Sequence, residues 1–233
     1  MRAVIGALMY ILFAFCFASN EVFEKYPKNI GSDEKLITVA FVLAGFDNAD
    51  VNMKSDVGVW LQDSYDEAAD KLSKELQVQL KFEITDIQHA PPALTDEIAY
   101  RTVGGQMHGP TILDAVKNTY KKHLNPDIIS VITKDKFYDD KFSNKIGFSG
   151  FTTLCEDMVP ILLTFNSDIE DDVDATATLL SKLIESSLDP VKWKEFGPRK
   201  DYFDGCNIRP KPKGDTYNEY YVFPIDKAPF YDF

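Results

Sequence analysis

The sequence predicts an α/β protein with a mostly parallel, twisted sheet, an antiparallel edge strand and packed helices in a three-layer-like arrangement. Two observations lead to this fold class. Segments with the apolar pattern of strands alternate along the chain with segments that have the three- and four-residue spacing of helices. The chain of 233 residues is also long enough for one sizeable domain, and it contains no internal repeat. Such alternation is typical of parallel sheets covered by helices.

Three elements open this alternation. The nearly continuous apolar run over 35–45 predicts a strand that is buried on both faces. Apolar side chains then recur at three- and four-residue steps over 57–76, which predicts a helix capped by Ser55 or Asp56. The strict alternation of apolar and polar side chains over 78–84 predicts a strand with one solvent-facing side.

The alternation continues along the rest of the chain. The remaining predicted elements are a long connection over 91–109, a helix over 110–124, a buried strand over 128–133, a polar loop over 134–147, extended segments over 148–154 and 159–165, and a helix over 173–188. Pro110 suits a helix start, and Asn125-Pro126 ends that helix. The last helix has an apolar face that we expect in the core: Val173, Ala177, Leu180, Leu183 and Ile184.

Residues 1–18 have the features of a signal peptide. Arg2 precedes an apolar stretch over 4–17, and Ala18 is a small residue placed for cleavage. The stretch is short for a bilayer span, with an uncleaved signal anchor as the alternative. We therefore expect a secreted, extracellular chain with an α/β domain over 19–190. An irregular extension, rich in proline and aromatic residues, is expected to pack on that domain over 191–233.

Two cysteines, Cys155 and Cys206, remain after removal of the signal peptide. In an oxidising compartment the simplest expectation is a disulfide between them, with two buried free thiols as the alternative. The formal net charge of −12 argues against nucleic acid and anionic membranes as partners, because both repel an acidic surface. The charge would suit a basic partner, although solubility alone also explains it.

Four segments, taken with the element order, resemble parts of a secreted zinc protease domain. The run over 127–136 resembles a strand with the sequence L-I-T, and the segment over 147–155 resembles an edge segment that ends in cysteine. The strand over 159–165 resembles the strand that precedes the active-site helix of such a domain. The segment over 174–190 stands in the place of that helix. The family that they resemble is the metzincin metalloproteases, in the reprolysin (adamalysin) branch found in saliva and venom. The resemblance implies the upper subdomain of a metzincin, without the lower subdomain.

The zinc motif of that family, H-E-x-x-H-x-x-G-x-x-H, has no counterpart in this chain. Laid over the last helix, its three ligand positions become Thr178, Lys182 and Leu188. Its general base becomes Leu179, and its turn glycine becomes Glu185. A lysine ammonium has no lone pair for a metal, and a leucine cannot accept a proton. We therefore expect neither catalytic residues nor a metal or other cofactor.

The expected function is that of a secreted, catalytically inactive metalloprotease-like protein that binds an extracellular protein. Two alternatives stay open: an active metalloendopeptidase with an unconventional site, and an unrelated secreted α/β ligand-binding protein. His89, His108 and His123 are not spaced as a metal site, so surface or loop positions are expected for them. The acidic run from Asp168 to Asp174 is expected to complement a helix N-terminus, with a calcium site as the alternative.

Overall fold

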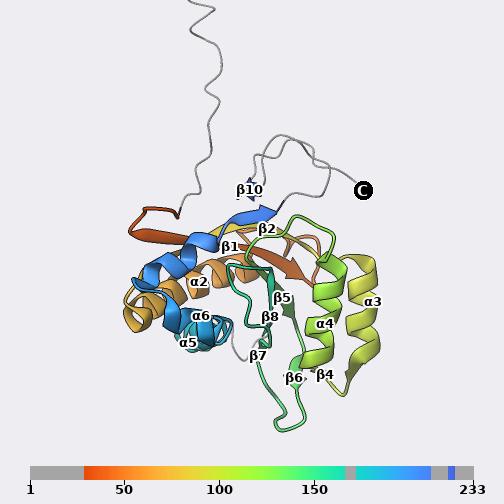
Figure 1. Cartoon of the computed structure of the whole chain (residues 1–233). Helices are drawn as coiled ribbons and strands as arrows, with labels where there is room; N and C mark the ends of the chain where they lie inside the picture. Colours follow the sequence, from red (N-terminus) through yellow and green to blue (C-terminus); the bar gives the residue numbers. More distant parts are fainter. Residues whose placement is uncertain (1–28, 166–171, 211–219, 224–233) are drawn as a thin grey trace, which may run out of the picture.

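A five-stranded sheet lies between two layers of helices in the computed structural model, which describes residues 29–165, 172–210 and 220–223 (Figure 1). In spatial order the strands are β2 (Gln79–His89), β1 (Glu34–Leu43), β5 (Ile128–Thr133), β8 (Val159–Thr164) and β7 (Gly147–Phe148). Neighbouring strands are parallel except for β7, which pairs antiparallel with β8. The predicted mostly parallel sheet with an antiparallel edge strand is thereby confirmed.

Helices cover both faces of this sheet (Figure 1). The helices on one face are α2 (Asp56–Leu76) and α5 (Val173–Glu185), and those on the other are α3 (Pro92–Arg101) and α4 (Gly109–Tyr120). Ser55 is the predicted cap of α2, and its hydroxyl oxygen accepts a hydrogen bond from the backbone N–H of Gly58. None of the helices in the described ranges is long and apolar enough to cross a membrane.

Strand β1 is buried on both faces, as its continuous apolar run predicts. Ile37 and Phe41 pack in the hydrophobic cluster on the α2 and α5 face. Val42 belongs to a second cluster, on the α3 and α4 face, because successive side chains of a strand point to opposite sides. The Phe41 ring lies 5.3 Å from the ring of Tyr65, and the Tyr65 ring meets Phe82 edge-on at 5.1 Å. Helix α2 is held to β1 and β2 by these contacts.

The segment over 91–109, predicted as a long connection, instead contains regular elements that the pattern did not predict. That segment contains α3, strand β3 (Thr102–Val103) and strand β4 (Gln106–His108). The paired prolines, which suggest a loop, instead begin α3, because proline suits the first helical position. Gly104 and Gly105 have φ angles of 61° and 73° and form the turn between β3 and β4. Strand β4 also pairs in parallel with β6 (Lys136–Tyr138), which lies inside the predicted polar loop.

Three other predicted elements are shorter than expected. Helix α4 ends at Tyr120 rather than at 124, and the Asn125 amide donates a hydrogen bond to the Tyr120 carbonyl. Helix α5 ends at Glu185 rather than at 188, before a further helix, α6 (Pro190–Glu195). The extended segment expected over 148–154 forms a strand only where β7 pairs with β8. The chain then turns, and Cys155 adopts a left-handed φ of 67°.

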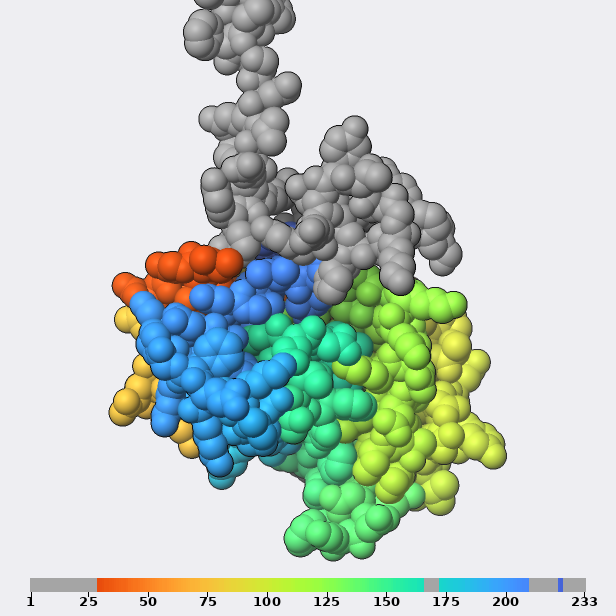
Figure 2. Space-filling view, viewed as in Figure 1, coloured from red at the N-terminus to blue at the C-terminus, as the bar shows by residue number. Residues whose placement is uncertain are grey.

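The C-terminal segment contributes to the core beside α2 and α5. A 3₁₀-helix, η1 (Arg199–Gly205), precedes strand β9 (Ile208–Pro210), which pairs antiparallel with β10 (Tyr220–Val222). Tyr202 and Phe203 of η1 are buried in the α2 and α5 cluster, and the Trp193 ring meets Tyr202 edge-on at 5.5 Å. Figure 2 shows this segment, in blue, beside the red segment that leads into β1. The predicted signal peptide over 1–18 lies outside the described residues.

Candidate functional site

Helix α5 stands where the resemblance places a zinc-binding helix, but its side chains do not converge on a metal. Leu188 is buried in the core at 6% exposure, whereas Lys182 is exposed to solvent. Leu179 packs on strand β7: a Cβ atom added at Gly147 would lie 2.7 Å from its Cδ2. Thr178 is half-buried. A catalytic zinc takes three nitrogen, sulfur or carboxylate ligands. These residues therefore do not fit the metal that the metzincin resemblance implies.

Two residues of the acidic run from Asp168 to Asp174, Asp172 and Asp174, lie at the start of α5. Residues 168–171 lie outside the described ranges, but Asp172 is the helix cap, and its carboxylate accepts a hydrogen bond from the Ala175 backbone N–H at 2.9 Å. Asp174 forms an ion pair with Lys71 of α2 at 2.7 Å. This hydrogen-bonded lysine lowers the pKa of Asp174. Both carboxylates thus stabilise the helix start, as expected for acids at the positive end of a helix dipole.

The three histidines lie on separate elements. His89 ends β2, and its Nε2 lies 2.8 Å from the side-chain oxygen of Asn48. His108 precedes α4, and its Nδ1 lies 2.7 Å from the Thr111 hydroxyl. His123 follows α4, with its ring edge-on to Tyr120. Within the described ranges, no three histidine, cysteine or acidic residues come together as a possible metal site.

A buried polar cluster joins the C-terminal segment to the sheet. Asp127, which is fully buried before β5, accepts hydrogen bonds from the backbone N–H and the hydroxyl of Thr38 at 2.8 and 2.7 Å. It also accepts one from the Asn207 backbone N–H at 3.0 Å, and it pairs with the Arg209 guanidinium at 2.6 Å. Arg209 Nε donates in turn to the Asn125 carbonyl at 2.9 Å. The Asp127 carboxylate is therefore saturated by protein donors, which suits a structural role rather than acid–base chemistry.

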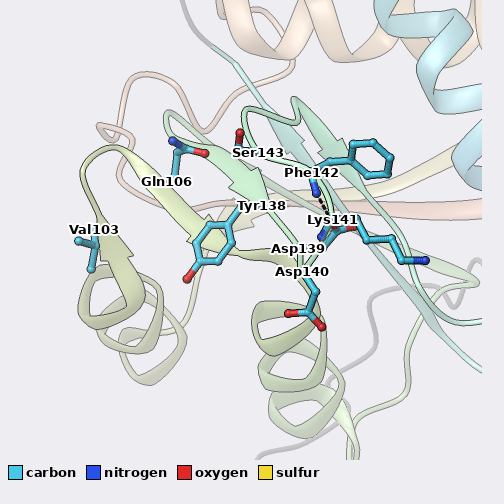
Figure 3. Close-up of a pocket in the computed structure, with 8 residues that line it drawn as sticks. All are labelled: Val103, Gln106, Tyr138, Asp139, Asp140, Lys141, Phe142 and Ser143. Atoms are coloured by element: carbon cyan, nitrogen blue, oxygen red, sulfur yellow. Dashed lines mark hydrogen bonds between the residues drawn. The ribbon is translucent and has the colours of Figure 1, made fainter.

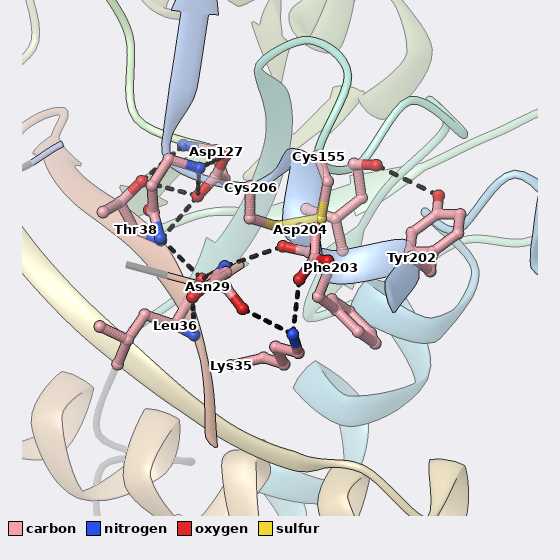
Figure 4. The surroundings of a disulfide bond; sticks show 12 residues. Asn29, Lys35, Leu36, Thr38, Asp127, Cys155, Tyr202, Phe203, Asp204 and Cys206 are labelled. Atoms are coloured by element: carbon pink, nitrogen blue, oxygen red, sulfur yellow. Dashed lines mark hydrogen bonds and ion pairs between the residues drawn. A yellow bond between two sulfur atoms is a disulfide. The ribbon is translucent and has the colours of Figure 1, made fainter. Parts of the chain in front are cut away.

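The predicted disulfide joins Cys155 and Cys206 next to this cluster (Figure 4). Gly205 precedes the second cysteine, and a Cβ atom at Gly205 would lie 2.7 Å from the Cys155 carbonyl oxygen. Lys35, which is 1% exposed, donates to the Asn29 carbonyl at 2.6 Å and pairs with Asp204 at 2.5 Å. This ion pair fastens η1 to the start of β1, and the disulfide fastens the end of η1 to the turn before β8.

A hollow on the surface is the candidate binding site. It has a volume of about 490 Å³ and lies between the β3–β4 hairpin and the loop over 139–145 (Figure 3). Its lining residues are Val103, Gln106, Tyr138, Asp139, Asp140, Lys141, Phe142 and Ser143. The polar composition of 134–147 hides this site in the sequence, because the pattern predicts only a loop there. Tyr138 and Phe142, two aromatic residues within that polar segment, are the signal that could have pointed to it.

Comparisons with known proteins find distant matches. No protein-family model matches the chain, and no curated protein matches it. Archaemetzincin from Methanopyrus kandleri, a metzincin-like zinc metallopeptidase, matches with a TM-score of 0.41 and 16% identity, over 73% of this chain and 86% of that one. A structure described as a chaperone–substrate complex matches with a TM-score of 0.39 and 10% identity, over 62% of this chain and 25% of that one. These matches do not single out the reprolysin branch.

Proposed function

We propose that this chain is a secreted, metalloprotease-like α/β protein that has no catalytic zinc and acts by binding an extracellular protein. In this proposal it is an inactive relative of the reprolysin-type proteases of saliva or venom. The proposal rests on the residues that stand at the zinc-ligand and general-base positions of the motif, in α5 and just after it. Leu188 is core, Leu179 packs on β7, and Lys182 points to solvent, so these positions serve the fold and not a metal.

Two further observations support the extracellular part of the proposal. The disulfide between Cys155 and Cys206 is of a kind that forms and persists in oxidising compartments and is rare in the cytosol. The N-terminal 18 residues have the charge and apolar pattern of an export signal. Binding is the activity that we propose because the surface hollow offers a place for a partner.

The test is to express the full chain in a secretory host, purify it from the medium and measure its mass, its zinc content and its peptidase activity. We expect a mass that corresponds to cleavage after Ala18 and no chelator-sensitive cleavage of a peptide library. After incubation with zinc and dialysis, we expect less than 0.1 zinc per chain, roughly the background for a protein without a zinc site. Retention of one zinc per chain, or cleavage that disappears in a variant lacking His89, His108 and His123, would contradict the proposal.

A matched variant shows that the zinc measurement can detect a site on this helix. Thr178→His with Lys182→His places two imidazoles one turn apart on α5, where side chains four residues apart are neighbours. We expect this variant to retain more zinc than the parent chain, because two histidines at this spacing form half of a zinc site.

A further inference from the structure

We propose that the hollow between the β3–β4 hairpin and the loop over 139–145 binds an arginine side chain of a partner protein. Asp140 receives the guanidinium in this proposal, and the Tyr138 ring lies against its flat face. The inference rests on the proposed function, because it names the surface through which a binding protein would act. Three features of the hollow carry it: a hydrogen-bonded loop, exposed aromatic and aliphatic surface, and an exposed carboxylate that is only loosely paired.

The loop over 139–145 is held in shape by its own contacts. The Asp139 carboxylate accepts hydrogen bonds from the backbone N–H groups of Lys141 and Phe142 at 2.9 and 2.7 Å, and it pairs with Lys145 at 2.5 Å. The backbone N–H of Asn144 donates to the Gln106 side-chain oxygen at 3.0 Å, which ties the loop to the hairpin. A surface that is already ordered loses less conformational entropy when it binds a partner.

Apolar side chains are unusually exposed around this hollow. Val103 is 78% exposed, Phe142 is 64% exposed and Tyr138 is 38% exposed. Figure 2 shows the loop that carries Phe142 projecting from the lower edge of the molecule. Exposed apolar groups that gather beside polar ones mark interaction sites on soluble proteins.

The charge of the hollow favours a cation. Asp140 is 99% exposed, and the basic atom that the structure places against it is His108 Nε2, at 3.8 Å, which is beyond hydrogen-bond distance. The neighbouring Asp139 is already paired with Lys145. Figure 3 shows Lys141 extending away from Tyr138, whereas Tyr138 stands between Val103 and Asp140. The hollow therefore presents an exposed carboxylate, whose ion pair with His108 is long at 3.8 Å, beside an aromatic face, on a chain whose net charge is −12.

An arginine matches these groups better than a lysine does. Its planar guanidinium can stack on a tyrosine ring while its N–H groups donate to a carboxylate, and its aliphatic stem can lie on apolar surface such as Val103. The Ser143 hydroxyl and the Gln106 amide lie at the rim of the same hollow (Figure 3) and are further polar groups for a partner's backbone.

The test uses NMR on the ¹⁵N-labelled full chain with three short blocked peptides as probes: Ac-Gly-Arg-Gly-NH₂ and its citrulline and lysine counterparts. We expect the arginine probe to shift amide signals over 102–108 and 136–145, with a dissociation constant of about tens of millimolar, because one exposed ion pair and one cation–π contact each contribute little. Citrulline has the same shape without the charge and should bind at least fivefold more weakly, as should lysine, which lacks the planar fork.

Two variants locate the effect. Asp140→Asn should weaken arginine binding about fivefold and leave citrulline binding unchanged, because it removes the charge and keeps the shape. Asp63→Asn is the matched control, since Asp63 is an exposed carboxylate on α2, and it should change nothing. Tyr138→Leu should remove the preference for arginine over lysine.

Three results would overturn the inference: no localised shifts, equal binding of arginine and citrulline, or shifts that depend on protein concentration without peptide. The last would identify a second copy of the chain as the occupant. Cleavage of the probes, visible in the same spectra, would instead contradict the proposed function. The two ideas can therefore fail separately.

Discussion

The buried ion pair between Asp127 and Arg209 allows a quantitative prediction about stability. Arg209 is 6% exposed and Asp127 is fully buried, so Arg209→Met leaves a carboxylate in the interior without its cation. Removing one partner of a buried pair costs about 3–5 kcal/mol of the free energy of unfolding. Thr38 and Asn207 still donate to Asp127, which favours the lower end of that range. The Asn125 carbonyl, which accepts from Arg209, loses a donor as well.

Urea denaturation followed by circular dichroism measures this effect. With a slope of about 2 kcal/mol per molar urea, a loss of about 3 kcal/mol lowers the midpoint by about 1.5 M. Arg101→Met is the matched control: Arg101 forms an exposed pair with Glu97 four residues away on α3, and such pairs contribute less than about 1 kcal/mol. Equal midpoints for the two variants would refute the reasoning that the buried pair fastens the C-terminal segment to the sheet.

Three further outcomes are expected. Leu180→Asp should prevent folding, because it puts an unpaired carboxylate at a position of α5 that is fully buried; a cooperative thermal transition like that of the parent would contradict this. Replacing Cys155 and Cys206 together with serine should lower the free energy of unfolding by about 4 kcal/mol in the chain-entropy model for a loop of 51 residues, as measured with guanidinium. Hydrogen bonds from Lys145 and two backbone N–H groups lower the pKa of Asp139 to about 2. Its ionised form therefore stabilises the loop fully above pH ~4 and loses that effect as the pH falls through about 2. An NMR titration should find this midpoint, and Lys145→Met should raise it; an unchanged midpoint in that variant would assign the shift to the backbone donors alone.

Elements with a strong repeating pattern could be predicted from the sequence. The strand around Phe41 and the helix around Leu61 each bury a long apolar face, and only one secondary structure gives each pattern a continuous buried side. The predicted apolar face of α5 is correct for Ala177, Leu180 and Ile184, whereas Val173 and Leu183 are only half-buried and pack against the edge of the cluster. The bond between Cys155 and Cys206 was likewise expected, once Cys16 is assigned to the predicted signal peptide.

Contacts between residues far apart in the chain could be established only from the folded structure. Asp127 carries no local pattern that assigns its partners, because Thr38, Asn207 and Arg209 reach it through the sheet and the C-terminal segment. The hollow at Tyr138 is built from a hairpin and a loop that are separated by more than 30 residues and joined through β4 and β6. The layered α/β class and the absence of an H-E-x-x-H-x-x-G-x-x-H motif can be read from the sequence alone, because both depend on residue type and spacing. The binding surface depends on how short strands pair, and strand pairing between distant segments is decided by the packing of the whole domain.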